Sequence, residues 1–171
     1  MADLGKNCHS GCCEIGGAMI IDVAKIPESG IKFSAEEPKA ILELTEKDEI
    51  QATGPITCQL YAQVVDETLI VRGTVSVPLE VSCARCTQIF STTATDSGFL
   101  RDFSGIQGSE MIDITEEIRE AILLSLPNFP ICSDHCKGLC AQCGKNLNKG
   151  VCGCRKPESG GPWGSLNNLS L

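Results

Sequence analysis

The sequence has no long apolar segment and no recognisable export signal. Its longest uncharged apolar run, Ala121 to Leu126, is far shorter than the roughly 20 residues that a membrane-spanning helix needs. The chain also opens without the basic stretch and following apolar stretch of a secretory leader. We therefore expect a cytoplasmic protein without a membrane partner.

Basic residues are few, and they are unevenly placed. The chain carries 14 Lys and Arg against 22 Asp and Glu, a net charge of -8, which disfavours binding to phosphates. Residues 1–131 hold nine basic and twenty acidic side chains, whereas residues 132–171 hold five basic and two acidic ones. The charge distribution therefore leaves an RNA contact open for the C-terminal region, although metal-bound thiolates there would add negative charge.

Histidine is scarce too, which bears on catalysis. His9 and His135 are the two histidines, and neither belongs to an HExxH-like pattern, so hydrolytic metal chemistry is not expected. The CxxC pairs lack the βαβ context of a thioredoxin-like site. We therefore expect a protein that is not an enzyme.

Cysteine, in contrast, is abundant, with 12 in 171 residues. In the absence of an export signal, metal ligation is a better interpretation than disulfides. Each CxxC pair allows one turn to direct two sulfurs at a single ion while backbone N–H groups donate to the thiolates. The spacing predicts a zinc-binding protein whose ligands are Cys83, Cys86, Cys132, Cys136, Cys140, Cys143, Cys152 and Cys154.

Eight thiolates suffice for two tetrahedral sites, so we expect two zinc ions. Our preferred division joins the 83–86 pair to Cys132 and Cys136 and leaves the last four cysteines as a self-contained second site, because those four fall within 15 residues. In the alternative division, the 83–86 pair faces the 140–143 pair as in a zinc ribbon. The sequence does not decide between the two.

The remaining cysteines and histidines are not expected to be principal ligands. Residues 1–18 have few apolar positions and predict a disordered N-terminal extension, in which three cysteines and His9 lack a CxxC arrangement. His135 is interpreted as a solvated loop residue, with substitution for Cys136 or a hydrogen bond to a ligand as the alternatives. Cys58 lies inside a strand pattern and is interpreted as a small core residue.

The middle of the chain predicts strands. Residues 19–26 are apolar and β-branched, two alternating runs within 56–82 flank Asp66 and Glu67 in a hairpin pattern, and a third run covers 90–103. Residues 34–54 are acidic and show no clear pattern. The expected fold class is α+β: an antiparallel β-sheet or open barrel with one packed helix and a C-terminal cysteine-rich zinc-binding lobe.

One helix is predicted at about 113–126. Asp113 precedes Glu116 by three residues, as in a capping box, and apolar residues recur every three or four positions until Pro127 ends the helix. The expected organisation is an extension at 1–18, a β-rich core at 19–131, and a zinc-binding lobe and tail at 132–171 that closes on the 83–86 pair.

These features together resemble the YceD family, bacterial and plastid proteins implicated in accumulation of the large-subunit (23S) ribosomal RNA. The resemblance rests on SCARC after a hairpin, a helix ending EAILLSLPNFPIC, the run DHCKGLCAQCGKNLNKGVCGC, and a tail with Trp163 and Leu166. It extends from about Met19 to the last residue. The tail departs from the family's Asp-Pro-Arg-Trp, because Gly160-Gly161-Pro162-Trp163 stands there.

The resemblance implies ribosome biogenesis through binding, without catalysis. The expected partner is 23S rRNA or a pre-large-subunit particle, and no small-molecule substrate is expected. Asn146 and Asn148 are expected to add hydrogen bonds to RNA. The alternatives are an adaptor that docks a basic ribosomal protein and, third, a thiol-redox protein. The residues expected to contact rRNA phosphates are Lys137, Lys145, Lys149, Arg155 and Lys156.

Overall fold

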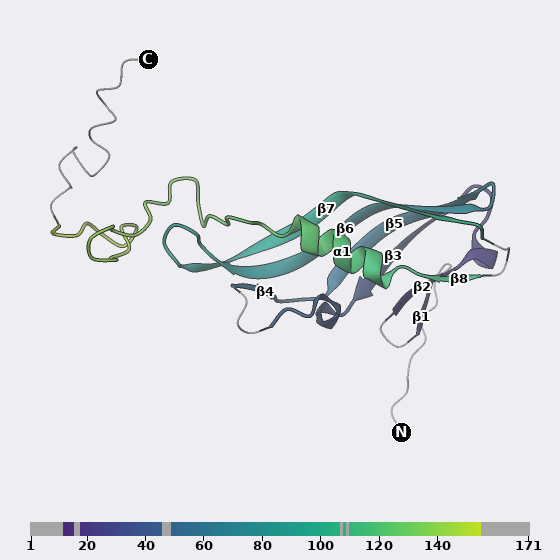
Figure 1. Ribbon diagram of the computed structural model, residues 1–171, viewed down its shortest axis with the longest axis horizontal. Helices are drawn as coiled ribbons and strands as arrows, with labels where there is room; N and C mark the ends of the chain where they lie inside the picture. Colours follow the sequence, from purple (N-terminus) through teal and green to yellow (C-terminus); the bar gives the residue numbers. More distant parts are fainter. Residues whose placement is uncertain (1–11, 16–17, 46–48, 107, 109, 155–171) are drawn as a thin grey trace, which may run out of the picture.

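The protein, seen in a computed structural model, is an elongated β-rich body with a small irregular lobe at one end (Figure 1). The structure describes residues 12–15, 18–45, 49–106, 108 and 110–154. No helix in this described part is long and apolar enough to cross a membrane. The strands are β1 (Cys12–Ile15), β2 (Ala18–Asp22), β3 (Ile31–Glu37), β4 (Ile50–Ala52), β5 (Ile56–Val65), β6 (Thr68–Ser82), β7 (Ile89–Ser104) and β8 (Met111–Asp113).

The main sheet is antiparallel and is built around β6. This strand pairs with β7 along one edge, and along the other edge with β5 and then, near its end, with β4; β3 pairs with the far edge of β5. Asp66 and Glu67 connect β5 to β6 with φ angles of 47° and 62°, as a two-residue hairpin with a primed turn requires. The predicted hairpin and the antiparallel sheet are confirmed, and the sheet is open.

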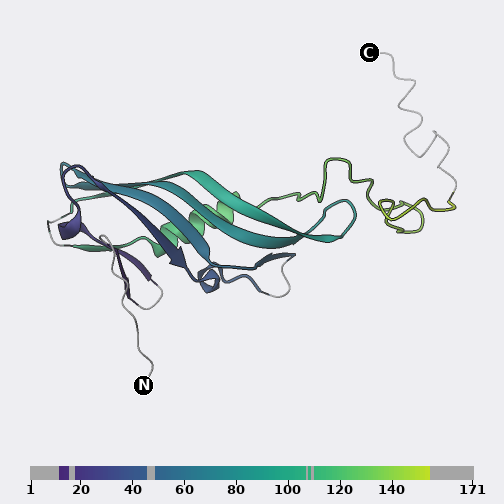
Figure 2. The ribbon, with the colours of Figure 1, turned by 180° about the vertical axis from the view of Figure 1, so that it is seen from behind.

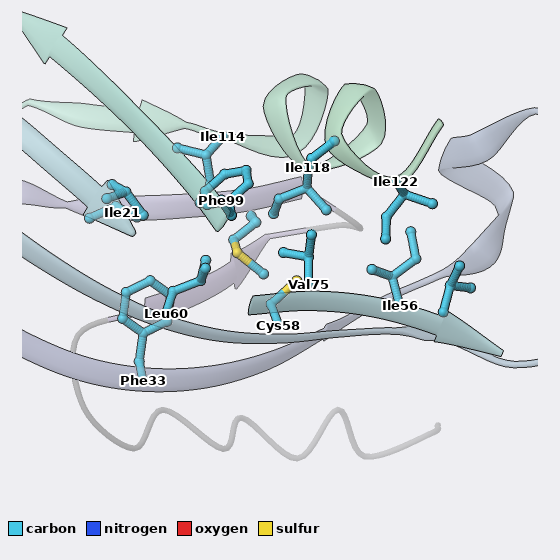
Figure 3. Packing of buried hydrophobic residues seen from close by; sticks show 14 of the residues in the cluster. Ile21, Phe33, Ile56, Cys58, Leu60, Val75, Phe99, Ile114, Ile118 and Ile122 are labelled. Atoms are coloured by element: carbon cyan, nitrogen blue, oxygen red, sulfur yellow. The ribbon is translucent and has the colours of Figure 1, made fainter. Parts of the chain in front are cut away.

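One face of the sheet is buried because apolar and polar side chains alternate along its strands. In β5, the side chains of Ile56, Cys58, Leu60 and Ala62 are buried, while the intervening residues are half-buried or exposed. Helix α1 (Thr115–Ser125) covers this face, and Figure 3 shows Ile118 and Ile122 pointing toward the sheet. The predictions of one packed helix and of a core position for Cys58 are confirmed.

The predicted element boundaries need small corrections. The helix begins at Thr115 because Asp113 Oδ1 accepts from the Thr115 N–H at 2.9 Å, one residue before the N–H that a capping box would use. The first predicted strand does not reach Ile26. It ends at Asp22, whose side chain accepts from the Ala24 N–H and starts a 3-10 helix, η1 (Val23–Lys25). A second 3-10 helix, η2 (Lys39–Leu42), follows β3.

The predicted N-terminal extension lies mostly outside the described residues. Within it, however, β1 pairs with β2, and β2 pairs with β8 in a small three-stranded sheet. Ile15 pairs with Ala18 across a Gly-Gly dipeptide, a sequence favoured in two-residue hairpins. Residues 12–15 are therefore a strand where disorder was expected.

Candidate metal centre

The first group of cysteines forms at the tip of the β6–β7 ribbon (Figure 1). The chain turns there through residues 83–86, which we call the first knuckle, with the Cys83 N–H donating to the Gln88 carbonyl at 2.9 Å. After α1, the chain returns to this tip, where the Ala84 N–H donates to the Pro130 carbonyl at 2.8 Å. The first tetrad that results consists of Cys83, Cys86, Cys132 and Cys136.

The sulfur atoms of the first tetrad have the spacing of a tetrahedral metal site. Cys83 Sγ lies 3.8 Å from Cys136 Sγ, and Cys86 Sγ lies 3.7 Å from Cys132 Sγ. Four thiolates about 2.3 Å from one zinc ion would be about 3.8 Å apart, whereas a disulfide needs about 2.05 Å. These cysteines form no disulfide. The tetrad is also mostly buried, so water has little access to an ion held there.

The second group lies entirely within the lobe, which we define as residues 132–154. This second tetrad consists of Cys140, Cys143, Cys152 and Cys154, whose sulfurs all lie within 4.8 Å of one another. Residues 140–143 form the second knuckle, closed by the Cys140 N–H donating to the Lys145 carbonyl at 2.9 Å. Gly144 follows with a φ of 68°, a conformation that glycine adopts without strain. The structure thus groups the cysteines as in the preferred division and not as in the cross-knuckle alternative.

The environment of the first tetrad differs from sulfur to sulfur. The Cys132 N–H donates to Cys83 Sγ at 3.4 Å and lowers the pKa of Cys83 to about 6. The Asn148 side chain donates to Cys136 Sγ at 3.3 Å and lowers the pKa of that thiol as well. Burial raises the pKa of Cys132 to about 12. Some of these thiols therefore ionise readily while their neighbour resists ionisation.

The thiols of the second tetrad also differ from one another in pKa. Backbone N–H groups of Cys143 and Gln142 lower the pKa of Cys140 to about 6, whereas the hydrogen bond with Cys143, together with burial, raises the pKa of Cys154 to about 12. Four adjacent thiolates repel one another unless a cation lies between them, and a bound divalent ion deprotonates the thiols that coordinate it. Both donor sets therefore fit a thiophilic metal ion such as Zn²⁺, held in a closed site of four sulfurs.

Two asparagines of the lobe connect the two tetrads. Asn146 and Asn148 belong to the loop that closes the second tetrad, yet Asn146 Nδ2 donates to the Cys86 carbonyl at 3.4 Å, and Asn148 Nδ2 donates to Cys136 Sγ. Asn148 Oδ1 also accepts from the Lys137 N–H at 2.8 Å. The second tetrad takes its four cysteines from one short segment, as in the preferred division, and its loop in addition supports the first tetrad.

Arg85, in the first knuckle, makes further hydrogen bonds to the lobe. Its carbonyl accepts from the Leu139 N–H at 3.0 Å, and its guanidinium donates to the Cys136 carbonyl at 3.4 Å. Gly138 packs so closely on Arg85 that a Cβ there would lie 3.1 Å from the Arg85 carbonyl oxygen. The first knuckle and the lobe thus form one hydrogen-bonded unit.

The other predicted site residues have mixed outcomes. Lys137, Lys145 and Lys149 are exposed on the lobe, with Lys145 Nζ donating to the Val151 carbonyl at 3.0 Å. Arg155, Lys156 and the N-terminal Cys8 and His9 lie outside the described residues. His135 is exposed, as expected.

The supporting role of the asparagines was not predicted. Asn146 and Asn148 were assigned to RNA, but their side chains are engaged within the protein. The signal that could have found them is their place two residues apart in a short loop between metal-binding cysteines. Short polar side chains at such positions often orient the ligands.

Comparisons with known proteins bear on function. Residues 102–170 match the family described as large ribosomal RNA subunit accumulation protein YceD. An uncharacterized protein of Mycobacterium tuberculosis (strain H37Rv) is 29% identical over 160 residues, which cover 78% of this chain and 72% of that protein. An uncharacterized protein of Mycobacterium leprae is 32% identical over 112 residues, covering 57% and 52%.

A plant relative carries the same name as the family. The large ribosomal RNA subunit accumulation protein YCED homolog 1, chloroplastic, of Arabidopsis thaliana is 43% identical over 58 residues, which cover 34% of this chain and 18% of that protein. No solved structure gives a significant match.

Proposed function

Since this chain belongs to the YceD family, we propose that it is a zinc-binding, non-catalytic factor that supports accumulation of 23S rRNA during assembly of the large ribosomal subunit in the cytoplasm. The observation that carries the proposal is the pair of closed cysteine tetrads at one end of a protein of this family. A site closed by four thiolates has no open position for water or substrate, which favours a structural role over catalysis.

Zinc would be held by Cys83, Cys86, Cys132 and Cys136 in one site and by Cys140, Cys143, Cys152 and Cys154 in the other. When bound, zinc would crosslink the first knuckle to the distant residues Cys132 and Cys136 at the first site and would close the lobe on itself at the second. The protein's own contribution is to orient the sulfurs, through Asn148 on Cys136 and the backbone N–H of Cys132 on Cys83. The lobe then becomes a rigid projection beyond the sheet.

The projecting lobe offers cations to phosphate groups. Lys137, Lys145 and Lys149 are exposed on it, and we propose that they contact rRNA or a pre-large-subunit particle. Phosphate contacts of this kind position a protein without reading sequence. They suit a factor that recognises an assembling particle.

Depletion of the protein in its own organism tests the proposed function. The expected result is a fall in the ratio of 23S to 16S rRNA and an accumulation of large-subunit precursors in sucrose gradients. Wild-type protein should restore the ratio, and Cys83→Ser with Cys86→Ser should not. An unchanged ratio on depletion would overturn the proposal.

Affinity purification separates RNA binding from the adaptor alternative. The tagged protein should recover 23S rRNA or its precursors, and ribonuclease treatment should release the accompanying ribosomal proteins. A ribosomal protein that stays bound after ribonuclease treatment would instead favour the adaptor function.

A further inference from the structure

A broad hollow lies on the face of the main sheet opposite α1, far from the metal centre in the fold. Figure 2 shows this face toward the viewer, with the helix behind the strands. The hollow has a volume of about 1120 Å³ and is lined by residues of β3, β5, β6 and β7. Small-molecule pockets usually measure roughly 300–1,000 Å³, so this hollow suits an extended ligand.

A row of four side chains crosses the hollow, one from each strand. Lys32 pairs with Tyr61, Tyr61 pairs with Arg72, and Arg72 pairs with Leu100. The Arg72 guanidinium carbon lies over the Tyr61 ring, 5.0 Å from its centre, so the cation is attracted to the aromatic face. Lys32, Arg72 and Leu100 are exposed. A lysine, an aromatic ring, a planar guanidinium and an apolar side chain therefore follow one another across the sheet.

The next row of the hollow is polar and uncharged. Ser34 pairs with Gln59, and Gln59 pairs with Thr74. These side chains offer both hydrogen-bond donors and acceptors next to the cationic row. They suit the edges of unpaired bases, which also carry both kinds of group.

The charge of the hollow contrasts with that of the whole chain. None of the described residues that line it is acidic, although the chain has a net charge of -8. Glu36 and Asp102 lie outside the lining, in rows on either side of it, and Asp96, also outside it, accepts from the Gly98 N–H at 2.8 Å. An anionic ligand would therefore be attracted to the hollow and repelled by its surroundings.

The lobe is a weaker cationic surface than its lysines imply. Residues 132–154 contain three lysines and one aspartate, whereas each zinc ion with four thiolates carries a formal charge of about -2. The two metal sites would thus offset the lysines around them. The cations of the hollow have no such counter-charge among its lining residues.

Glycines keep the floor of the hollow open. At Gly98, where the N–H donates to Asp96 Oδ1 at 2.8 Å, no side chain stands over the strand. Gly73 packs directly on the backbone of β5, where a Cβ would overlap Gln59. A flat ligand could therefore approach the strands closely.

We propose that this hollow binds a single-stranded segment of RNA, with bases stacked on Arg72 and Tyr61 and phosphates held by Lys32 and Arg72. Base stacking on aromatic rings and on guanidinium planes is how sheet surfaces hold unpaired RNA. This inference rests on the proposed function and adds a second surface to it, so that the sheet holds the RNA strand while the lobe contacts the particle.

Fluorescence anisotropy with the full, zinc-loaded chain tests the inference. The probe is a labelled single-stranded RNA of mixed sequence and about 12 nucleotides, within the roughly 4–16 nucleotides of comparable sites. Lys32→Ala with Arg72→Ala should weaken binding at least about tenfold. It should also reduce the slope of log Kd against log salt by about 1.4, or 0.7 for each lost phosphate contact.

Two controls separate stacking and local charge from general effects. Gln88→Glu with Asn128→Asp changes the net charge by the same two units at exposed positions outside the hollow and should leave Kd within about twofold. Tyr61→Ala should weaken binding about tenfold, whereas Tyr61→Phe, which keeps the ring, should not. Because Lys32 and Arg72 are exposed, their double variant should keep the parent's melting temperature and circular dichroism.

The outcomes also distinguish this inference from the proposed function. If the parent binds RNA and restores the 23S level but the Lys32 and Arg72 variant binds equally well, the hollow is not the site and the proposed function stands. If duplex RNA or heparin binds the hollow as tightly as the single strand, the surface is a general polyanion site and the inference is overturned. If depletion leaves the 23S level unchanged while the hollow variant loses RNA binding, the proposed function alone fails.

Discussion

At the scale of single residues, Asn148 connects the two tetrads of the metal centre. Its backbone belongs to the loop between Cys143 and Cys152 of the second tetrad, whereas its side chain donates to Cys136 of the first. A donor to a metal-bound sulfur fixes the direction of its lone pairs and offsets part of its charge. Ordering of the second site should therefore strengthen metal binding at the first.

Asn148→Ala is expected to weaken zinc binding at the first tetrad about 10–100-fold, the usual effect of losing a partner that orients a ligand. The measurement is zinc transfer to a chromogenic chelator, in which one of two phases should become faster. Gln142→Ala is the matched control, because that side chain is exposed in the second knuckle. Equal transfer kinetics in Asn148→Ala and the parent would contradict the account.

The grouping of the cysteines could be predicted from the sequence, but the roles of the two asparagines could not. The spacing of CxxC pairs limits which sulfurs can share an ion, so the grouping of the eight cysteines could be favoured from sequence. Asn146 meets Cys86 across 60 residues of sequence, and such a contact depends on how the lobe folds back on the ribbon tip. Asparagine in a lysine-rich loop is also typical of RNA contacts, and that pattern does not reveal the hydrogen bonds that these side chains make within the protein.

At the scale of elements, the pairing of β6 depends on the close approach of Gly73 to the backbone of β5. The pairing of β6 with β7 shifts between Gly73 and Val75, and Gly73 lies against the backbone of β5. A bulge at this point increases the local twist, which helps the two long strands to curve around α1. The hollow on the outer face lies over the same bulge.

Gly73→Ala is expected to lower the free energy of unfolding by about 2–3 kcal/mol, because the added methyl group would overlap the Gln59 carbonyl oxygen and force the strands apart. Gly98→Ala on the neighbouring strand, where the added methyl group would make only an ordinary contact with Asp96 at 3.5 Å, should change it by less than about 0.5 kcal/mol. Urea denaturation measures both. Equal stabilities of the two variants would show that β5 and β6 do not meet as closely as described.

Some elements could be predicted and others could not, for physical reasons. Strand β5 has a clean alternation because one of its faces is buried and the other is polar. Strand β3 (IKFSAEE) shows no clear alternation in its sequence, because one of its inward positions is the charged residue Glu37, which is buried at 2% exposure. The end of β2 depends on a local Asp22 hydrogen bond that competes with strand extension, which an apolar pattern does not reveal.

At the scale of the whole molecule, the protein consists of a sheet-and-helix body and a metal-dependent lobe. The body has a continuous apolar core that contains none of the tetrad cysteines. The buried cysteines of the first tetrad form a separate cluster, and Phe90 packs against both clusters. Stability of the body should therefore depend little on metal, while order in the lobe should depend on it.

Removal of zinc by a strong chelator is expected to unfold the lobe and to leave the body folded. In hydrogen exchange, the amides of Cys140 and Leu147, which donate within the lobe, should lose their protection. Amides in the centre of β5 and β6 should keep theirs. Simultaneous loss of protection in both regions would show that the body also depends on the metal.

Zinc per chain, measured by elemental analysis of protein purified without added metal, tests directly whether the two tetrads are separate metal sites. We expect two ions in the parent and one in the variant Cys140→Ser with Cys143→Ser, because each tetrad would hold its own ion. The retained ion should be bound more weakly than in the parent, because Asn148 loses the support of its loop. One ion in the parent and none in the variant would contradict the account, because the two tetrads would then not be separate metal sites.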